Sequence, residues 1–268
     1  MSEKLIELEK NGGVATLFLN RPDKRNALND AMRSELITAL EDVTADRSIR
    51  ALVLAGRGKG FCAGGDVSAM ARRLDEPQDS VAINGWRRQQ QVHHAQMLLH
   101  NLPMPTIAAV HGSAAGLGAD TALACDFVFA GSDAGFSWGY IKRGLIPDGG
   151  GMYFLPRRVG LAKAKELIFT GRSLDAEEAL ALGVADRVVP AEDLLAQAQG
   201  WAATLAEGSP TALALGKSIL NQSFELTLED VFARGSQAQG ICYSSAEHRA
   251  SVKAFVEQAA ARAAKAGR

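Results

Sequence analysis

The chain has little of what marks nucleic-acid-binding and membrane proteins. Its 268 residues include 29 basic and 30 acidic side chains, so the formal net charge of −1 provides no basic field for nucleic acid. No apolar run approaches the ~20 residues that cross a bilayer, and the segment Met1–Lys4 has no apolar signal core. We therefore expect a cytoplasmic protein that binds neither nucleic acid nor membrane.

Cysteine is also scarce, with only Cys62, Cys125 and Cys242 in the chain. An odd number of scattered cysteines fits a reducing compartment and argues against a disulfide framework. Cys125 lies in an apolar run, where a buried and inert thiol is expected. Cys62 lies in a glycine-rich turn and is a candidate nucleophile. No histidine stands beside it in the sequence, so this is the weaker hypothesis for Cys62.

Two common enzyme signatures are incomplete. A dinucleotide fingerprint built on Gly116 and Gly118 requires a third glycine at position 121, which is Thr. The nucleophile elbow of serine hydrolases requires glycine two positions before Ser113, where the chain has His111. We therefore expect neither a nicotinamide-dependent dehydrogenase nor a serine hydrolase.

A stretch rich in histidine contains His93, His94 and His100. Neighbouring side chains on a helix diverge by about 100°, so adjacent histidines do not converge on one metal ion. We expect surface histidines here, and neither a metal nor another cofactor.

What is present is a strong α/β pattern in the first half of the chain. With 47% hydrophobic residues, the chain can bury one large core. Apolar runs that read as strands alternate with amphipathic helices, which is typical of a sheet with parallel crossovers. We predict strands at 5–8, 14–19, 51–55, 106–110 and 127–130, a helix at 30–43, and a helical stretch at 67–101 that breaks near Pro77.

Beyond residue 151 nearly the whole chain has a helical pattern. Asp175 and Glu178 resemble a capping-box start, and Gly183 is a typical helix stop. Further helices are predicted at 191–207, 210–221, 227–243 and 246–264. The pattern predicts an α/β core followed by a helical C-terminal part, for which we take the bounds 1–200 and 201–268.

Two glycine-rich turns, Phe61–Asp66 and His111–Asp120, each follow a predicted buried strand and lead into a helix. Glycine has no Cβ, so a ligand atom can approach the main-chain N–H groups of such turns, and a helix start adds partial positive charge. Two N–H groups that converge on one oxygen would form an oxyanion hole.

Asp148 follows Pro147 and precedes three glycines, at a loop where a helix begins. One interpretation is a helix N-cap, for which Asp is favoured. The other is a general acid/base whose pKa is raised by an apolar wall of Leu145, Ile146 and Met152. The local sequence leaves both interpretations open.

A series of short motifs runs through the chain in a particular order, from about residue 5 to residue 258. They are Asn20-Arg21-Pro22, Arg25-Asn26-Ala27-Leu28, the turn 61–66, the run 112–126 that ends Leu123-Ala124-Cys125-Asp126, the loop 144–151, Leu155-Pro156-Arg157 and the stretch 171–179. Together these motifs resemble the crotonase superfamily, also called the enoyl-CoA hydratase/isomerase family. The Ile-Pro-Asp-Gly-Gly run resembles the ring-epoxide isomerases of phenylacetyl-CoA breakdown.

This resemblance implies a spiral of ββα units, with a C-terminal helical region over 201–268 that forms homotrimers or homohexamers. It implies an acyl-CoA thioester as substrate, and no cofactor beyond that coenzyme A. The N–H groups of Gly65 and Leu117 would bind the thioester oxygen, with Gly116 keeping the approach open. The adenine and pantetheine portions would lie along Arg25, Ala27, Ala63 and Asp66, and helical residues 67–101 would wall the acyl pocket.

The family's hydratases use two glutamates, and those positions match Asp120 and Tyr140. A tyrosine with a reference pKa near ~10 cannot replace a carboxylate base at neutral pH, so Tyr140 is expected to line the pocket. Asp148 matches the acid of some enoyl-CoA isomerases, which suggests an isomerase with Asp120 as helper. A hydratase that uses Asp120 and Asp148, and a non-catalytic acyl-CoA-binding scaffold, are the alternatives.

Overall fold

A six-stranded sheet forms the centre of the molecule. The computed structural model describes residues 4–75 and 77–266. The strand order is β1-β2-β3-β4-β6-β9, in which β1 pairs antiparallel with β2 and all other neighbours are parallel. The strands are β1 (Ile6–Asn11), β2 (Val14–Leu19), β3 (Ala51–Gly56), β4 (Thr106–Val110), β6 (Phe127–Gly131) and β9 (Arg187–Val189).

The central strands are buried on both faces, as their continuous apolar runs predict. Alternate side chains of β3 enter different cores: Leu52 and Leu54 belong to one buried cluster, and Ala51 and Val53 to the other. Helix α8 (Leu194–Ala206) covers the second face with Leu194, Ala198 and Ala202, which lie four residues apart on one side of the helix.

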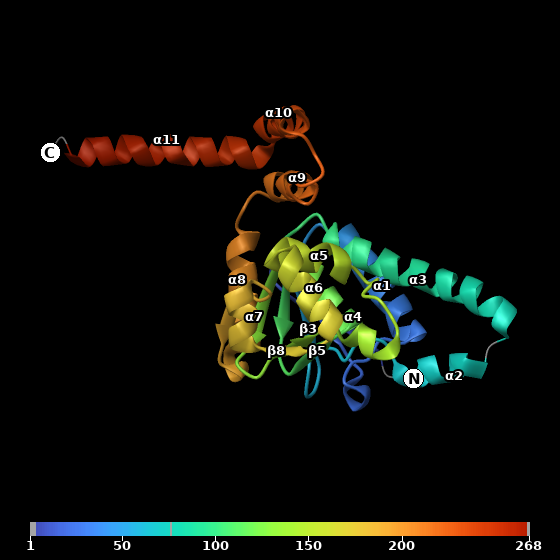
Figure 1. Cartoon of the computed structure of the whole chain (residues 1–268). Coiled ribbons are helices and arrows are strands. Elements are labelled where there is room, and N and C mark those ends of the chain that lie inside the picture. Colours follow the sequence, from blue (N-terminus) through green and yellow to red (C-terminus); the bar gives the residue numbers. More distant parts are fainter. Residues whose placement is uncertain (1–3, 76, 267–268) are drawn as a thin grey trace.

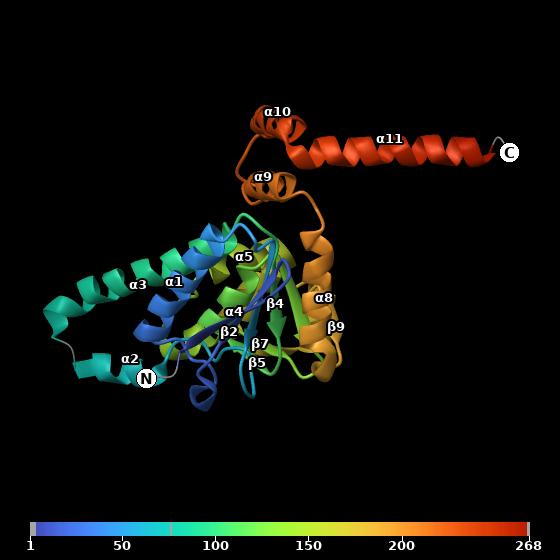
Figure 2. The ribbon, with the colours of Figure 1, turned by 180° about the vertical axis from the view of Figure 1, so that it is seen from behind.

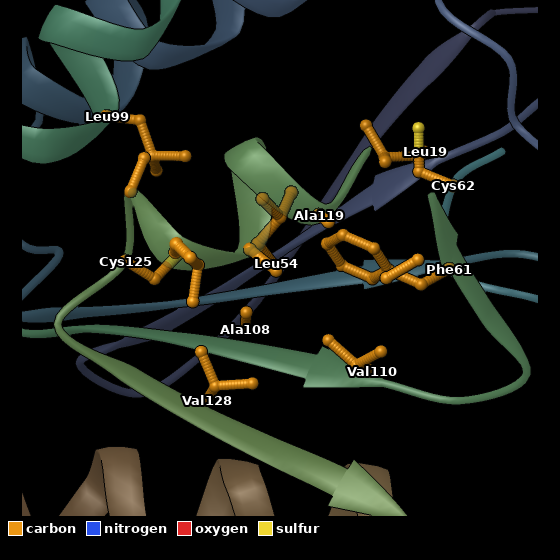
Figure 3. Close-up of a cluster of buried hydrophobic side chains, with 14 of the residues drawn as sticks. Leu19, Leu54, Phe61, Cys62, Leu99, Ala108, Val110, Ala119, Cys125 and Val128 are labelled. Atoms are coloured by element: carbon orange, nitrogen blue, oxygen red, sulfur yellow. The ribbon is translucent and has the colours of Figure 1, made fainter. Parts of the chain in front are cut away.

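Helices α1 (Asp30–Ala45), α3 (Gln78–His100) and α4 (Leu117–Leu123) contribute to the core on the first face. Figure 3 shows part of this core, where side chains from the strands, from α4 and from the turn that carries Phe61 and Cys62 gather together. Both glycine-rich turns therefore rest on a packed interior.

A second, three-stranded sheet builds the spiral. It contains β5 (Ser113–Ala115), β7 (Gly135–Ser137) and β8 (Ser173–Asp175) in the order β5-β7-β8. Strand β4 continues into β5 and then α4, and β6 continues into β7. The turn after β3 joins this layer through an isolated bridge between Cys62 and Ala114. The predicted α/β spiral of ββα units is thus confirmed.

The remaining helices of the body connect these layers. They are α2 (Val67–Arg72), α5 (Gly151–Val159), α6 (Leu161–Thr170) and α7 (Ala176–Leu182). The helical stretch predicted for 67–101 is interrupted between α2 and α3, as Pro77 indicated. Asp175 caps α7 through the N–H of Glu178, and Gly183 ends α7 in a left-handed conformation.

Three C-terminal helices project from the body: α9 (Pro210–Leu220), α10 (Leu228–Ser244) and α11 (Ala246–Ala266). Figures 1 and 2 show α11 extending away from the rest of the molecule in both views. The predicted division at residue 200 falls inside α8, which packs on the sheet, so the change to projecting helices comes after Ala206.

Within residues 4–75 and 77–266, no helix is long and apolar enough to cross a membrane. Most of Met1–Lys4, where the sequence has no apolar signal core, lies outside the described residues.

Candidate active site

The two glycine-rich turns lie side by side because one pairs with the other through backbone hydrogen bonds. The N–H of Phe61 donates to the carbonyl of His111 at 2.9 Å, and the N–H of Cys62 donates to that of Ser113 at 2.9 Å. In return the N–H of Ala115 donates to the carbonyl of Cys62 at 2.9 Å. This parallel pairing fixes the register between the turn that carries Gly65 and the turn that carries Leu117.

Two glycines allow this close approach. Gly64 has a φ of +91°, and a Cβ there would lie 2.4 Å from the carbonyl oxygen of Ala115 and 3.3 Å from the nitrogen of Leu117. A Cβ on Gly118 would lie 2.3 Å from the carbonyl oxygen of Cys62. Any side chain at either position would push the two turns apart.

Gly65 and Leu117, the predicted oxyanion-hole residues, border the same space. Both line a cavity of about 330 Å³ together with Ala63, Gly116, Tyr140 and Leu145. Within the part of the chain that the structure describes, neither the N–H of Gly65 nor that of Leu117 donates to a protein acceptor. Leu117 begins α4, so its N–H also lies at the positive end of a helix. The arrangement offers two unpaired donors at one cavity.

The residues predicted to hold coenzyme A lie on two adjacent segments. The N–H of Ala63 donates to the carbonyl of Arg25 at 2.9 Å, which aligns the loop before α1 with the first glycine-rich turn. Arg25 is exposed and Ala27 is buried. The carboxylate of Asp66 is already engaged, since it pairs with Arg21 at 2.6 Å and caps α2. The Arg21 guanidinium lowers the pKa of Asp66, so its side chain has a structural role here.

Asn26 is a positioning residue that the sequence analysis included in a motif but gave no role. Its fully buried amide donates to the carbonyls of Arg57, Gly60 and Phe61, at 2.8 to 3.1 Å. It therefore ties the loop before α1 to the first glycine-rich turn.

Cys62 is fully buried, and burial raises the pKa of its thiol to about 12. The hypothesis of a nucleophilic Cys62 is wrong, since a protonated and inaccessible thiol cannot attack a substrate.

Asp148 lines a cavity of about 180 Å³ that also contains Gly65, Leu117 and Tyr140. The N-cap of α5 is Gly150, and no side chain caps this helix. The N-cap interpretation of Asp148 is therefore wrong. Leu145 and Ile146 of the predicted apolar wall do line this cavity with Asp148.

Asp120 lies behind Tyr140 and is fully buried. Its two carboxylate oxygens accept hydrogen bonds from Trp138 Nε1 at 3.0 Å and from the Tyr140 hydroxyl at 2.7 Å. Burial raises the pKa of Asp120 to about 7, against the opposing effect of these hydrogen bonds. Tyr140 lines both cavities of the site, and burial raises the pKa of its hydroxyl as well.

The three histidines of α3 have different surroundings. His93 Nε2 lies 3.8 Å from Asp148 Oδ2, whereas His94 Nε2 lies 3.8 Å from Glu41 Oε1. His100 is half-buried against Phe154, with ring centroids 5.0 Å apart, so the expectation of a surface side chain is wrong for it. Among the described residues no group of three or more His, Cys, Asp or Glu side chains is placed to hold a metal ion.

A two-sheet ββα spiral with paired N–H donors beside a carboxylate defines a crotonase-type site. The family model for enoyl-CoA hydratase/isomerase matches residues 9–263. The chain therefore belongs to the enoyl-CoA hydratase/isomerase family, the crotonase superfamily, and it is an acyl-CoA enzyme.

Individual relatives cover nearly the whole chain. The "Probable enoyl-CoA hydratase" of Rhizobium meliloti is 38% identical over 266 residues, covering 94% of this chain and 99% of that protein. The 1,2-epoxyphenylacetyl-CoA isomerase of Escherichia coli is 39% identical over 252 residues and covers 94% of each chain. The crystal structure of an enoyl-CoA hydratase/isomerase from Cupriavidus metallidurans matches with a TM-score of 0.88 and 36% identity, covering 96% of this chain and 95% of that one.

Proposed function

We propose that this chain is an enoyl-CoA isomerase that moves a double bond of an acyl-CoA thioester through Asp148. The observation that carries the proposal is that Asp148, Gly65 and Leu117 line one cavity. Asp66 also lines this cavity, but its carboxylate is engaged by Arg21 and by the start of α2. Asp148 is thus the carboxylate best placed to exchange a proton with a bound substrate.

In the proposed reaction the N–H groups of Gly65 and Leu117 bind the thioester carbonyl oxygen. Asp148 removes a proton from C2, and the C–H electron pair moves toward the carbonyl to form an enolate. One oxyanion-hole donor typically contributes ~3–4 kcal/mol to the rate. Asp148 then returns the proton to C4, which moves the double bond from C3=C4 to C2=C3 and regenerates the carboxylate.

Asp120 assists this chemistry indirectly. Its carboxylate holds the Tyr140 hydroxyl at 2.7 Å, so the tyrosine ring stays in place as a wall of the cavity. Asp120 thus acts as a positioning residue through Tyr140.

A hydratase is the second candidate, favoured by the name of the Rhizobium meliloti relative. It would need both Asp120 and Asp148 to contact one water molecule. Asp120 is fully buried and both of its oxygens are occupied by Trp138 and Tyr140. This arrangement favours the isomerase over the hydratase.

The coenzyme A portion is proposed to follow the paired segments that contain Arg25, Ala27 and Ala63, through backbone contacts. Lys142 and Arg143 line the 330 Å³ cavity and were not singled out in the sequence. They add positive charge to this cavity, which would attract the negatively charged phosphates of coenzyme A. We propose that no cofactor beyond the coenzyme A of the substrate takes part.

We also propose that the chain forms homotrimers or homohexamers through its projecting helices. Phe224 is 77% exposed, Phe232 is 65% exposed and Phe255 is 73% exposed. Phe224 lies between α9 and α10, Phe232 on α10 and Phe255 on α11. Large aromatic side chains exposed in this way on a part of the chain that leaves the body are typical of surfaces that pack against another chain.

The function is tested by incubating the protein separately with a 3-enoyl-CoA and with crotonyl-CoA and following both products. We expect conversion of the 3-enoyl-CoA to the 2-enoyl-CoA, with little hydration of crotonyl-CoA. Rapid hydration without a double-bond shift would support the hydratase instead.

The Asp148→Asn variant separates an enzyme from a scaffold. It should lower isomerisation by about 10²–10⁴-fold, the range for loss of a general acid/base, while acyl-CoA affinity stays within about twofold. Residual turnover that is equal in Asp148→Asn and the unmodified protein would favour the non-catalytic scaffold.

A further inference from the structure

Asp148 lines two cavities, and the proposed reaction uses only one of them. The smaller cavity contains Gly65 and Leu117. The larger one, of about 540 Å³, is lined by His93, Met97, His100, Tyr153 and Phe154 as well as Asp148. Asp148 therefore borders both the proposed substrate cavity and the cavity that contains His93.

His93 lies next to Asp148. Its Nε2 lies 3.8 Å from Asp148 Oδ2, and the side chains are 45% and 29% exposed, respectively. A separation above 3.5 Å between polar atoms is readily spanned by one bridging water or by a small side-chain rotation. His93 thus has contact with solvent and a short path to the carboxylate.

The position of His93 on α3 follows from the helical pattern. Val92, Gln96 and Leu99 are buried, so this face of α3 is directed toward the body. His93 borders that face beside the site, whereas His94 is turned by about 100° and faces Glu41. Since the helix would form equally well with another polar residue at position 93, its packing does not require histidine there.

We propose that His93 transfers protons between Asp148 and bulk water. The inference rests on the proposed role of Asp148 as the base. Neutral imidazole accepts the proton of the Asp148 carboxyl at the Nε2 lone pair, and the imidazolium releases its Nδ1 proton to water. Reversal of these steps delivers a solvent proton to Asp148. His93 touches no reacting atom and acts only through Asp148.

The chemistry suits histidine because a neutral imidazole has one acceptor and one donor nitrogen, so it can take up a proton at one and release a proton from the other. Other titratable or charged groups around Asp148 are Arg33, Asp66, Arg73 and Tyr140 in the smaller cavity, His100 and Tyr153 in the larger one, and the buried Asp120. The carboxylate of Asp66 is engaged by Arg21, and that of Asp120 by Trp138 and Tyr140. Arginine does not lose its proton near neutral pH, and burial lowers the pKa of His100.

The consequence is measurable as isotope exchange. A proton removed from C2 has two fates: direct return to C4, or loss to water through His93. In D2O the second route places deuterium at C4 of the product and at C2 of recovered substrate. The ratio of deuterium uptake to isomerisation reports the relay, and a purely structural role of His93 would not change this ratio selectively.

The experiment compares His93→Gln with the matched control His94→Gln, using full-length protein, a 3-enoyl-CoA in D2O and mass spectrometry. We expect isomerisation within about threefold of the unmodified protein in both variants, and a deuterium ratio that falls at least about fivefold in His93→Gln alone. In His93→Ala, added imidazole should restore deuterium uptake.

An unchanged deuterium ratio in His93→Gln, or an equal fall in His94→Gln, would overturn the proton relay. Failure of the proposed function is recognised separately: either the unmodified protein would not isomerise the 3-enoyl-CoA, or Asp148→Asn would retain full isomerisation.

Discussion

At the scale of single residues, the N–H of Leu117 is the group that substitution can remove most cleanly. Leu117 is the first residue of α4, the helical position where proline is best tolerated. Leu117→Pro should lower turnover by about 10²–10³-fold because it removes one oxyanion-hole donor.

Leu117→Ala is the matched control, since it removes the same side chain and keeps the N–H. It should retain most of the activity, measured as initial isomerisation rates on folded protein. Equal losses in Leu117→Pro and Leu117→Ala would mean that the Leu117 side chain, and not its backbone, is what the reaction needs.

The buried carboxyl of Asp120 predicts a specific dependence of stability on pH. Burial raises its pKa from 3.8 to about 7 in the folded state, while the unfolded chain keeps a value near ~3.9. Between these values the folded state binds more protons than the unfolded state. The contribution of Asp120 to the free energy of unfolding therefore decreases as pH rises from about 4 to about 7.

Asp120→Asn removes this titration. Relative to the unmodified protein, the free energy of unfolding of Asp120→Asn should therefore increase between pH 5 and pH 8, as measured by urea denaturation. A difference between the two proteins that is constant over this pH range would show that Asp120 is not a high-pKa carboxyl.

Residue roles were predictable from the sequence where only the backbone was needed. The two glycine-rich turns follow from strand, turn and helix in succession, and the resemblance to the crotonase superfamily singles out Gly65 and Leu117 within them. The structure places both residues at one cavity. The pairing of Asp120 with Trp138 and Tyr140 was not predictable, because it depends on how the chain that follows β7 packs against α4. The two interpretations of Asp148 were separable only once Gly150 was located as the N-cap.

At the scale of elements, the parallel pairing of the two turns depends on Gly64. A Cβ at this position would meet a carbonyl oxygen at 2.4 Å, in a backbone conformation with a φ of +91°. Backbone strain alone costs about 1–3 kcal/mol, and the clash adds to it, so Gly64→Ala should lower the free energy of unfolding by more than this amount. The variant should also lower activity at least about 10²-fold.

The control is Gly12→Ala, in the turn between β1 and β2. Gly12 has a φ of +57° and open space around its Cβ position, so alanine there brings backbone strain without a clash. Urea denaturation and isomerisation rates should show a smaller loss of stability and normal activity. If Gly64→Ala behaves like Gly12→Ala, the close approach of the turns is not what builds the site.

Long elements with a strong pattern were predicted well, and short ones were missed. Strands β2, β3, β4 and β6 of the large sheet and the helices α1 and α10 match the predicted ranges closely, and β1 extends three residues beyond its predicted end. Strands β5, β7, β8 and β9 have three residues each, too few for alternation to be visible. Their neighbours in the fold, and not their own sequences, determine that they are strands.

At the scale of the whole molecule, the projecting helices predict a defined assembly. The protein should sediment at three or six times the mass of one chain. Phe232→Glu should shift this equilibrium toward smaller species, because a charge replaces an aromatic side chain that is 65% exposed on α10. A monomer in the unmodified protein at micromolar concentration would contradict the proposed assembly.

The most direct measurement is a crystal structure of the protein with a bound acyl-CoA thioester. The account predicts that the thioester oxygen lies within hydrogen-bond distance of the backbone nitrogens of both Gly65 and Leu117, and that a carboxylate oxygen of Asp148 faces C2. A thioester oxygen bound elsewhere, or an Asp148 carboxylate directed away from the acyl group, would contradict it.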